Sequence, residues 1–253
     1  MELTVDEEHL GRSEALWRSS ARQRELEAIE LVRVQRMILV APHPDDEVLG
    51  AAGLIQRALT DGIEIEVVAV TDGEGSHPAS VASKHLDLAN IRHWESRTAL
   101  HRLGWDEPVI TRLHLPDSGV TRHRKRLDES LSEIVRPGDL CVAPWRHDGH
   151  PDHDACGASA RAVCREVGAR MLGYLVWAWH WADPEGADIP WRHCRRLELE
   201  RRASARKRWA TEAFQSQTHP IGPDAADAAV LPAALMRRFW RSYEVYVDEL
   251  TSA

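Results

Sequence analysis

Long apolar segments are missing from this sequence. No run approaches the roughly 18 apolar residues that a membrane-spanning helix needs. The most apolar aromatic stretch, residues 171–182, is too short and contains His180. The first eight residues, Met1–Glu8, are acidic, whereas a signal peptide starts with basic residues and continues into an apolar segment. We therefore expect no membrane span and a cytoplasmic location.

Positive charge and paired cysteines are also scarce. Lys and Arg together number 32, against 40 Asp and Glu, so the formal net charge is -8. A protein that binds nucleic acid by releasing counterions usually carries the opposite sign, so we predict no nucleic-acid partner. The cysteines form no C-x-x-C pair, which favours free thiols in a reducing compartment. They are Cys141, Cys156, Cys164 and Cys194.

The remaining composition is that of an ordinary globular chain. A hydrophobic fraction of 43% and a charged fraction of 28% exclude a collagen-like, disulfide-knotted or wholly disordered protein. A length of 253 residues fits one domain. We predict a single domain over 1–253, with an N-terminal helical extension over 1–34, a core over 35–217 and a C-terminal helical segment over 218–253.

The hydrophobic pattern predicts strands that alternate with helices. The wholly apolar run Met37–Ala41 is typical of a strand buried on both faces. Polar residues 6–31 carry apolar side chains near helical spacing, which predicts one or two helices outside the core. This alternation predicts an α/β fold whose mostly parallel sheet is covered on both faces. The other predicted strands span 63–70, 109–115, 140–144 and 172–181, and the predicted core helices span 48–59, 91–103, 127–135, 154–167, 192–214 and 233–250.

A crowded group of acids follows the first of these strands. The segment Ala41-Pro42-His43-Pro44-Asp45-Asp46-Glu47 places one histidine and three acids within five positions, at the start of a predicted helix. A turn needs about one Asp to cap the helix that follows it. Three neighbouring carboxylates repel one another, so this segment indicates a site for a cation.

A second polar segment follows the strand over 140–144. It reads His147-Asp148-Gly149-His150-Pro151-Asp152-His153-Asp154 and again joins a strand to a helix. The two imidazoles of His150 and His153, three residues apart, can face one point. Both segments fall at carboxyl ends of strands, where sites in parallel sheets lie. Together they offer two histidines and one carboxylate, the ligand set of a catalytic zinc site with an open position for water.

These motifs resemble the PIG-L (LmbE-like) family of N-acetylglucosamine deacetylases, which are zinc hydrolases with a Rossmann-like fold. The similarity extends to Thr71-Asp72-Gly73-Glu74, to Leu115-Pro116-Asp117-Ser118-Gly119, and to Lys207 with Ser216-Gln217. It covers roughly residues 37–217. The resemblance implies a three-layer Rossmann-like fold in which 35–217 is the catalytic core.

The resemblance also implies roles for single residues. His43, Asp46 and His153 match the zinc ligands of the family. Asp45 matches the general base, which takes a proton from the attacking water. His150 matches the residue that assists the tetrahedral intermediate, as oxyanion stabiliser or general acid.

Four further positions carry expectations, three from comparison with the family and one, Asp152, from the residues alone. Arg92 and Asp117 match positions that contact the hydroxyl or head groups of the substrate. Some members place a Tyr two residues before the first His of H-P-D-H, and this sequence has Asp148 there. Asp152 is predicted either to hydrogen-bond His150 or His153 and orient the ring, or to cap the following helix.

The implied activity is hydrolysis of the N-acetyl amide of an N-acetylglucosamine-type conjugate, giving a free amine and acetate. Zinc lowers the pKa of a bound water to about 7 and polarises an amide carbonyl. Fe²⁺ or Co²⁺ could occupy the same ligands. The expected partner is a small N-acetylated amino-sugar conjugate, and the N-terminal helices could serve a homo-oligomer interface.

Three other interpretations stay open at this point. One is a related zinc amidase that removes a larger acyl group or acts on a thiol conjugate. Another is an iron oxygenase, which uses two histidines and a carboxylate, although the extra Asp45 argues against it. The last is a metal-containing sugar-binding protein without turnover, against which the intact Asp45 and His150 argue.

Alternating tryptophans provide one further expectation. Trp177, Trp179 and Trp181 would share one face if residues 172–181 formed a strand. Aromatic faces stack on the apolar face of a sugar ring, and they also make good core. Trp145, just after a strand, is another candidate for the rim of the site.

Overall fold

The computed structural model describes residues 12–250. Within them, one seven-stranded sheet has the order β3-β2-β1-β4-β5-β7-β6. Strands β1 to β5 run parallel, and β7 pairs antiparallel with both β5 and β6. The predicted α/β class with a mostly parallel sheet is confirmed. The strands are β1 (Arg36–Ala41), β2 (Glu64–Thr71), β3 (Ile110–Leu115), β4 (Leu140–Pro144), β5 (Arg170–Tyr174), β6 (Cys194–Glu198) and β7 (Tyr243–Asp248).

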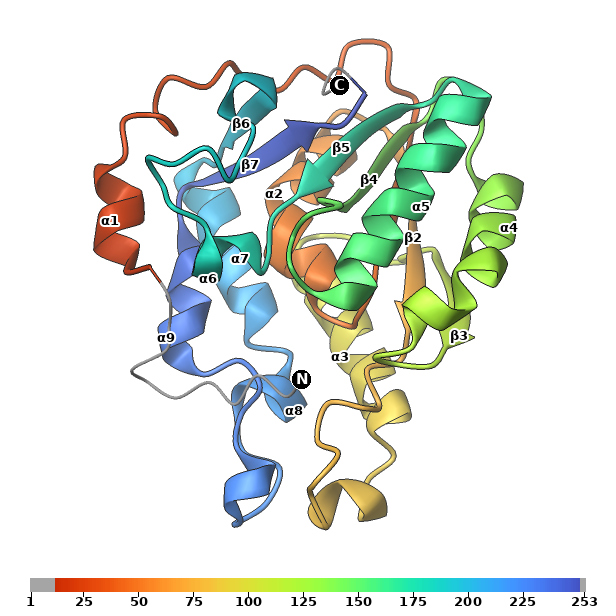
Figure 1. The fold of residues 1–253 in the computed structure, drawn as a ribbon, viewed down its shortest axis with the longest axis vertical. Helices are drawn as coiled ribbons and strands as arrows, with labels where there is room; N and C mark the ends of the chain where they lie inside the picture. The colour runs from red at the N-terminus through yellow and green to blue at the C-terminus, as the bar shows by residue number, and fades with distance from the viewer. Residues whose placement is uncertain (1–11, 251–253) are drawn as a thin grey trace.

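Helices cover both faces of the sheet (Figure 1). On one face lie α2 (Asp46–Thr60), α3 (Leu88–Arg102) and α7 (Arg201–Thr211), and on the other lie α4 (Arg124–Ile134) and α5 (Pro151–Val167). Strand β1 serves both layers, because Met37 and Leu39 join the first core while Ile38 and Val40 join the second. A strand buried on both faces must be apolar throughout, as the sequence pattern predicted.

The ends of β1 and β4 meet at one edge of the sheet, where α2 and α5 begin. Helix α5 has a well-defined start and end: His150 occupies its N-cap, Pro151 its first turn, and Gly168 (φ +78°) its C-cap. Because β1 and β4 are parallel neighbours, both polar segments emerge side by side. The fold thus brings residues more than 100 positions apart to one edge.

Helix α2 is kinked one turn after it begins, at Ala51 (φ -140°, ψ 17°). The carboxylate of Glu244 on β7 accepts the freed N–H groups of Gly53 (2.8 Å) and Leu54 (3.1 Å). Lys207 Nζ donates to the carbonyl of Leu49 (2.9 Å) and pairs with Glu244 (2.7 Å). A Cβ at position 53 would lie 2.8 Å from Glu244 Oε2, so the close approach depends on glycine.

The strand predicted over 172–181 is wrong beyond Tyr174. Strand β5 ends there, and Ala178–Trp181 form the short helix α6. The buried carboxylate of Asp148 accepts the N–H groups of Val176 (2.9 Å), Trp177 (2.9 Å) and Ala178 (3.0 Å). These bonds turn the chain out of the sheet, so the three tryptophans do not share a strand face.

The two helices predicted after residue 190 are also wrong in part. Residues 192–214 contain strand β6 before helix α7, and residues 233–250 contain helix α9 (Ala233–Met236) followed by strand β7. The apolar spacing in these segments fits a helix, but antiparallel pairing between β6 and β7 decides the structure. Arg196 lies 3.8 Å from the ring centroid of Tyr243 across this pair. The short helix α8 (Gln215–Thr218) lies between α7 and α9.

The N-terminal segment is less helical than predicted. Helix α1 (Glu14–Ser19) is short, and Ala28 forms an isolated bridge with Arg196 instead of continuing a helix. Trp17 is buried and donates to the carbonyl of Trp179 (3.0 Å). The part of the prediction before residue 12 lies outside the described residues. Across residues 12–250, every helix is too short or too polar to span a bilayer.

Candidate metal centre

Three side-chain atoms from the two polar segments form a small triangle. His43 Nδ1 lies 3.3 Å from Asp46 Oδ2, His153 Nε2 lies 3.2 Å from Asp46 Oδ2, and the two imidazole nitrogens lie 3.3 Å apart. Tetrahedral zinc with bonds of about 2.0–2.1 Å separates its ligand atoms by about 3.3–3.4 Å. The triangle therefore has the dimensions of one face of a zinc tetrahedron. His43, His150 and His153 also form a group whose ring nitrogens lie within 4.8 Å of one another.

Carboxylates hold the outer nitrogen of both imidazoles. His153 Nδ1 lies 2.9 Å from Asp148 Oδ2, and His43 Nε2 lies 3.4 Å from both Asp117 Oδ1 and Asp152 Oδ2. A carboxylate on one nitrogen favours the proton there, which leaves the other nitrogen free to bind a metal. The two histidines thus present opposite ring nitrogens to the centre.

The charges of the centre support one another. Burial alone would raise the pKa of Asp46, but His153 and His43 hold it well below its usual range. Burial alone would lower the pKa of His153, but Asp46 and Asp148 raise it to about 9. Burial likewise opposes the charge on His43, yet Asp117, Asp152 and Asp46 raise its pKa well above the usual value. The site is built to hold positive charge between its acids.

Residues 38–164, half of the chain, match the PIG-L family, described as GlcNAc-PI de-N-acetylase. The chain belongs to the PIG-L family. The matched segment contains both polar motifs and all three atoms of the triangle. The resemblance seen in the sequence is therefore confirmed at the level of the family.

Curated relatives of this PIG-L chain are named as deacetylases. Diacetylchitobiose deacetylase of Thermococcus kodakarensis is 28% identical over 132 residues, which are 49% of this chain and 47% of that protein. The 1D-myo-inositol 2-acetamido-2-deoxy-alpha-D-glucopyranoside deacetylase of Mycolicibacterium smegmatis is 32% identical over 171 residues, 58% of each chain. The chain spans about half the length of the curated relatives it matches.

Solved structures share the fold of this PIG-L chain. The zinc inhibited form of teicoplanin deacetylase Orf2 has a TM-score of 0.60 at 18% identity, covering 84% of this chain and 97% of that one. N,N'-diacetylchitobiose deacetylase from Pyrococcus horikoshii has a TM-score of 0.59 at 18% identity, covering 100% and 96%. At these identities the likeness shows the three-layer fold alone.

Asp45 lies beside the triangle in an unusual backbone conformation. It precedes α2 with φ +131°, a region that L-residues avoid and that costs about 1–3 kcal/mol. Its carboxyl is buried, and this burial, followed by the charges of Asp46 and Glu47, raises its pKa well above the usual range. Asp46 faces the imidazoles, and the charges of His43 and Arg92 act on the neighbouring Asp45 carboxyl in the opposite sense, lowering its pKa.

His150 contacts the centre from the N-cap of α5. Its Nδ1 accepts the N–H of Asp152 (3.2 Å), and its ring stacks on Trp177 with centroids 5.7 Å apart. Burial, followed by the charges of His153 and His43, lowers the pKa of His150 to about 4. With Nδ1 occupied as an acceptor, the neutral ring carries its proton on Nε2.

Asp152 and Asp148 contact different histidines: Asp152 faces His43, and Asp148 bonds His153. The prediction for Asp152 was either a bond to His150 or His153 or a cap on the following helix. Its carboxylate instead accepts the N–H groups of Ser118 (2.8 Å) and Val120 (3.1 Å) and faces His43. The carboxylate that bonds the outer nitrogen of His153 belongs to Asp148. From the sequence, Asp148 was visible only as a departure from the family pattern, although an acid after a buried strand was a usable signal.

The two predicted substrate contacts have different surroundings. Asp117 accepts the N–H of Gly75 (2.9 Å) and faces His43; burial opposes its charge, but His43 lowers its pKa to about 2. Arg92 is buried and bonds the carbonyl of Gly73, Ser76 Oγ (2.8 Å) and Ser216 Oγ (3.3 Å). Through these hydrogen bonds, Arg92 connects the loop after β2 to helix α8.

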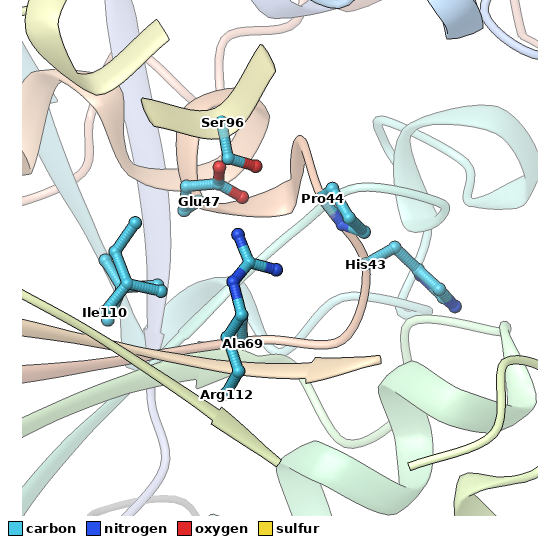
Figure 2. Close-up of a pocket in the computed structure, with 8 residues that line it drawn as sticks. His43, Pro44, Glu47, Ala69, Ser96, Ile110 and Arg112 are labelled. Atoms are coloured by element: carbon cyan, nitrogen blue, oxygen red, sulfur yellow. The ribbon is translucent and has the colours of Figure 1, made fainter. Parts of the chain in front are cut away.

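Glu47 is a buried residue of the site that the sequence reasoning did not select. Its Oε2 accepts the N–H of Asp45 (3.0 Å), and burial raises its pKa to about 7. Its Oε1 and the Nε of Arg112 are buried without a partner at a cavity of about 10 Å³, roughly the size of one water. Figure 2 shows the Arg112 guanidinium directed towards Glu47, with the His43 ring turned away.

Proposed function

We propose that this PIG-L chain is a zinc-dependent hydrolase that removes the acetyl group from an N-acetylated amino-sugar conjugate. The observation that carries the proposal is the triangle of His43, Asp46 and His153, with edges of 3.2–3.3 Å, beside the buried Asp45. Asp45 is a carboxylate beside the triangle that is not one of its three members, and an amide hydrolase needs such a carboxylate as a base. The names of the curated relatives support the substrate class.

The three ligand residues would hold zinc at the open face of the triangle. Bound zinc supplies a water whose pKa is about 7 and polarises the amide carbonyl. Asp148 orients His153, and Asp117 and Asp152 orient His43, because these carboxylates accept hydrogen bonds from the outer ring nitrogens. An orienting carboxylate of this kind is typically worth 10- to 100-fold in metal affinity or activity.

Asp45 takes the proton from the attacking water in this proposal. Its raised pKa makes it a stronger base than an exposed aspartate, and its backbone places it next to the ligand Asp46. The proton then has to reach the departing amine. Asp45 can return it there, because it holds the proton taken from the water until the C–N bond breaks.

His150 stabilises the oxygen of the tetrahedral intermediate. Its Nδ1 is occupied by the N–H of Asp152, so its Nε2–H is the group available to donate. The Trp177 ring against it fixes the imidazole plane. A preorganised donor of this kind contributes about 10²–10³ in kcat. We therefore assign His150 as a neutral hydrogen-bond donor.

The test is acetate release from a panel of conjugates, with and without a chelator. The panel contains free N-acetylglucosamine, an inositol glycoside, a malate glycoside, a chitooligosaccharide and a nucleotide-sugar, and the metal content of the purified protein is measured in parallel. Acetate release that the chelator removes and zinc restores is the expected result. Stoichiometric metal without acetate from any member would overturn the acetyl assignment, and longer N-acyl or thiol conjugates would then be assayed.

A further inference from the structure

One tryptophan near the centre is exposed although its neighbours are buried. Trp181 at the end of α6 is 45% exposed, whereas Trp145 is 4% and Trp179 is 6% exposed. Trp179 packs edge-on against Trp17 at 4.9 Å, which places it in the core. A large apolar ring left in solvent beside a polar site is a feature of ligand-binding surfaces.

The exposed ring is held in a fixed orientation. The indole N–H of Trp181 donates to the carbonyl of Asp148 (2.7 Å), and its ring is nearly parallel to that of Trp145, with centroids 6.4 Å apart and an angle of 16°. Gly149 passes so close that a Cβ there would lie 2.6 Å from Trp181 Nε1. With one face towards Trp145 and its only donor used, Trp181 offers a ligand an aromatic surface and no hydrogen bond.

The same short loop connects Trp181 to the catalytic groups. The backbone carbonyl of Asp148 accepts the indole N–H, and the side-chain carboxylate of the same residue bonds His153 Nδ1. Gly149, beneath the ring edge, directly precedes His150. His147, at the start of this loop, is exposed and contacts Trp145 edge-on at 5.5 Å, so a group able to bond hydroxyls lies nearby.

We propose that Trp181 stacks against a pyranose ring attached to the acetamido sugar, so that the enzyme prefers substrates with at least two rings. This inference rests on the proposed function. A pyranose has an apolar C–H face and a rim of hydroxyls, which matches an indole face without a free donor next to a polar loop. An inositol or an acyl chain at the same place would be an outcome of the test.

The experiment compares Trp181→Ala, Trp181→Phe and Trp209→Ala in the full chain. Trp209 is a matched control, because it is 52% exposed and stacks with Arg102 at the C-terminal end of α3, at the edge of the sheet opposite the metal centre. The substrates are N-acetylglucosamine and N,N'-diacetylchitobiose, and kcat/KM for acetate release and zinc content are measured for each variant.

Trp181→Ala is expected to lower kcat/KM for the disaccharide about tenfold, with less than about a twofold change for the monosaccharide and unchanged zinc. Trp181→Phe keeps an aromatic face and loses the N–H bond, so it should retain most of the disaccharide preference. Trp209→Ala should match the wild type. Equal losses on both substrates would show that Trp181 only supports the loop, and unchanged kinetics would show that it takes no part; either result overturns the inference.

Calorimetric binding of the same two sugars, of an inositol glycoside of N-acetylglucosamine and of a longer N-acyl derivative of glucosamine separates this inference from the proposed function. If the metal-loaded wild type releases no acetate from any member of the conjugate panel, the proposed function fails. The stacking role still stands if the wild type binds the disaccharide and Trp181→Ala weakens that binding about tenfold. Binding that is equal in both proteins, or that prefers an inositol or an acyl chain to the disaccharide, overturns the stacking role even when acetate is released. Absence of disaccharide binding at millimolar concentration also overturns it.

Discussion

The parallel part of the sheet and the segment after it contribute different things to the site. Residues 36–174 contain β1 to β5 and every histidine and acid in the candidate metal groups found among the described residues. Residues 175–250 reach the same region mainly through backbone contacts: Gln217 bonds the carbonyl of Pro44, and Lys207 bonds that of Leu49. The first region holds the proposed ligands, and the second fixes the chain that carries them.

This difference explains where polar side chains are buried. In the first region they lie at the ends of strands, where ligand atoms must converge. In the second, the Lys207–Glu244 pair lies inside the protein against the kinked helix α2, which starts at the proposed ligand Asp46. The family match over 38–164 ends before this support begins. Substitutions in the two regions should therefore separate chemistry from stability.

The largest effect is expected for His153→Ala in the parallel region. Removing one of three ligands should abolish stoichiometric zinc, and hydrolysis should fall to background because both the nucleophile and the carbonyl polarisation depend on the metal. Metal analysis of the purified variant and the acetate assay measure the two effects. His147→Ala, an exposed histidine of the same loop, should keep its zinc. Full zinc occupancy in His153→Ala would contradict the assignment.

A second prediction separates the adjacent acids. Asp45→Asn should retain stoichiometric zinc and lose about 10²–10⁴ in kcat, the usual contribution of a general base. Asp46→Asn should lose zinc as well as turnover, because its Oδ2 lies 3.2–3.3 Å from both imidazole nitrogens. Measured zinc content and kcat should therefore differ in pattern between two neighbouring positions. Wild-type turnover in Asp45→Asn would remove that residue from the mechanism.

Predictability from sequence also differed between the two regions. Buried parallel strands such as Met37–Ala41 are apolar throughout, and turns rich in His and Asp mark their ends, so strand positions and ligand candidates were visible. The apolar spacing of the segment 243–248 fits either a helix or a strand. Its antiparallel pairing with β5 and β6 depends on residues far away in the sequence. Local spacing could not decide between them.

Parts of the site were hidden for a related reason. Asp148 accepts the backbone N–H groups of 176–178, which lie near it only in the fold. Glu47 accepts the N–H of Asp45 two residues away, where the backbone φ of +131° at Asp45 is not visible in the sequence. Their residue type showed that each was an acid in a motif, but not which partner it would meet. The orientation of Asp152 towards His43 likewise depends on the loop after β3.

A third prediction tests the supporting region. Glu244→Gln should lower the free energy of unfolding by about 3–5 kcal/mol, because it leaves the buried Lys207 without its charge partner. Its folded fraction should bind zinc normally. Glu198→Gln on β6 removes an exposed partner of Arg196 and should cost no more than about 1 kcal/mol. Denaturant unfolding measures both; similar values for the two variants would contradict the proposed division between the regions.

The smallest effect is expected inside the parallel region, at a residue that binds no metal. Glu47→Ala should lower kcat about tenfold with zinc retained, because it leaves the buried N–H of the strained Asp45 without its acceptor. Glu47→Gln keeps an oxygen acceptor and should recover most of the rate. Loss of kcat at constant KM and zinc content would indicate that Glu47 positions the base. An equal loss in both variants would instead point to the carboxylate charge, and unchanged kcat would show that the helix start alone holds Asp45 in place.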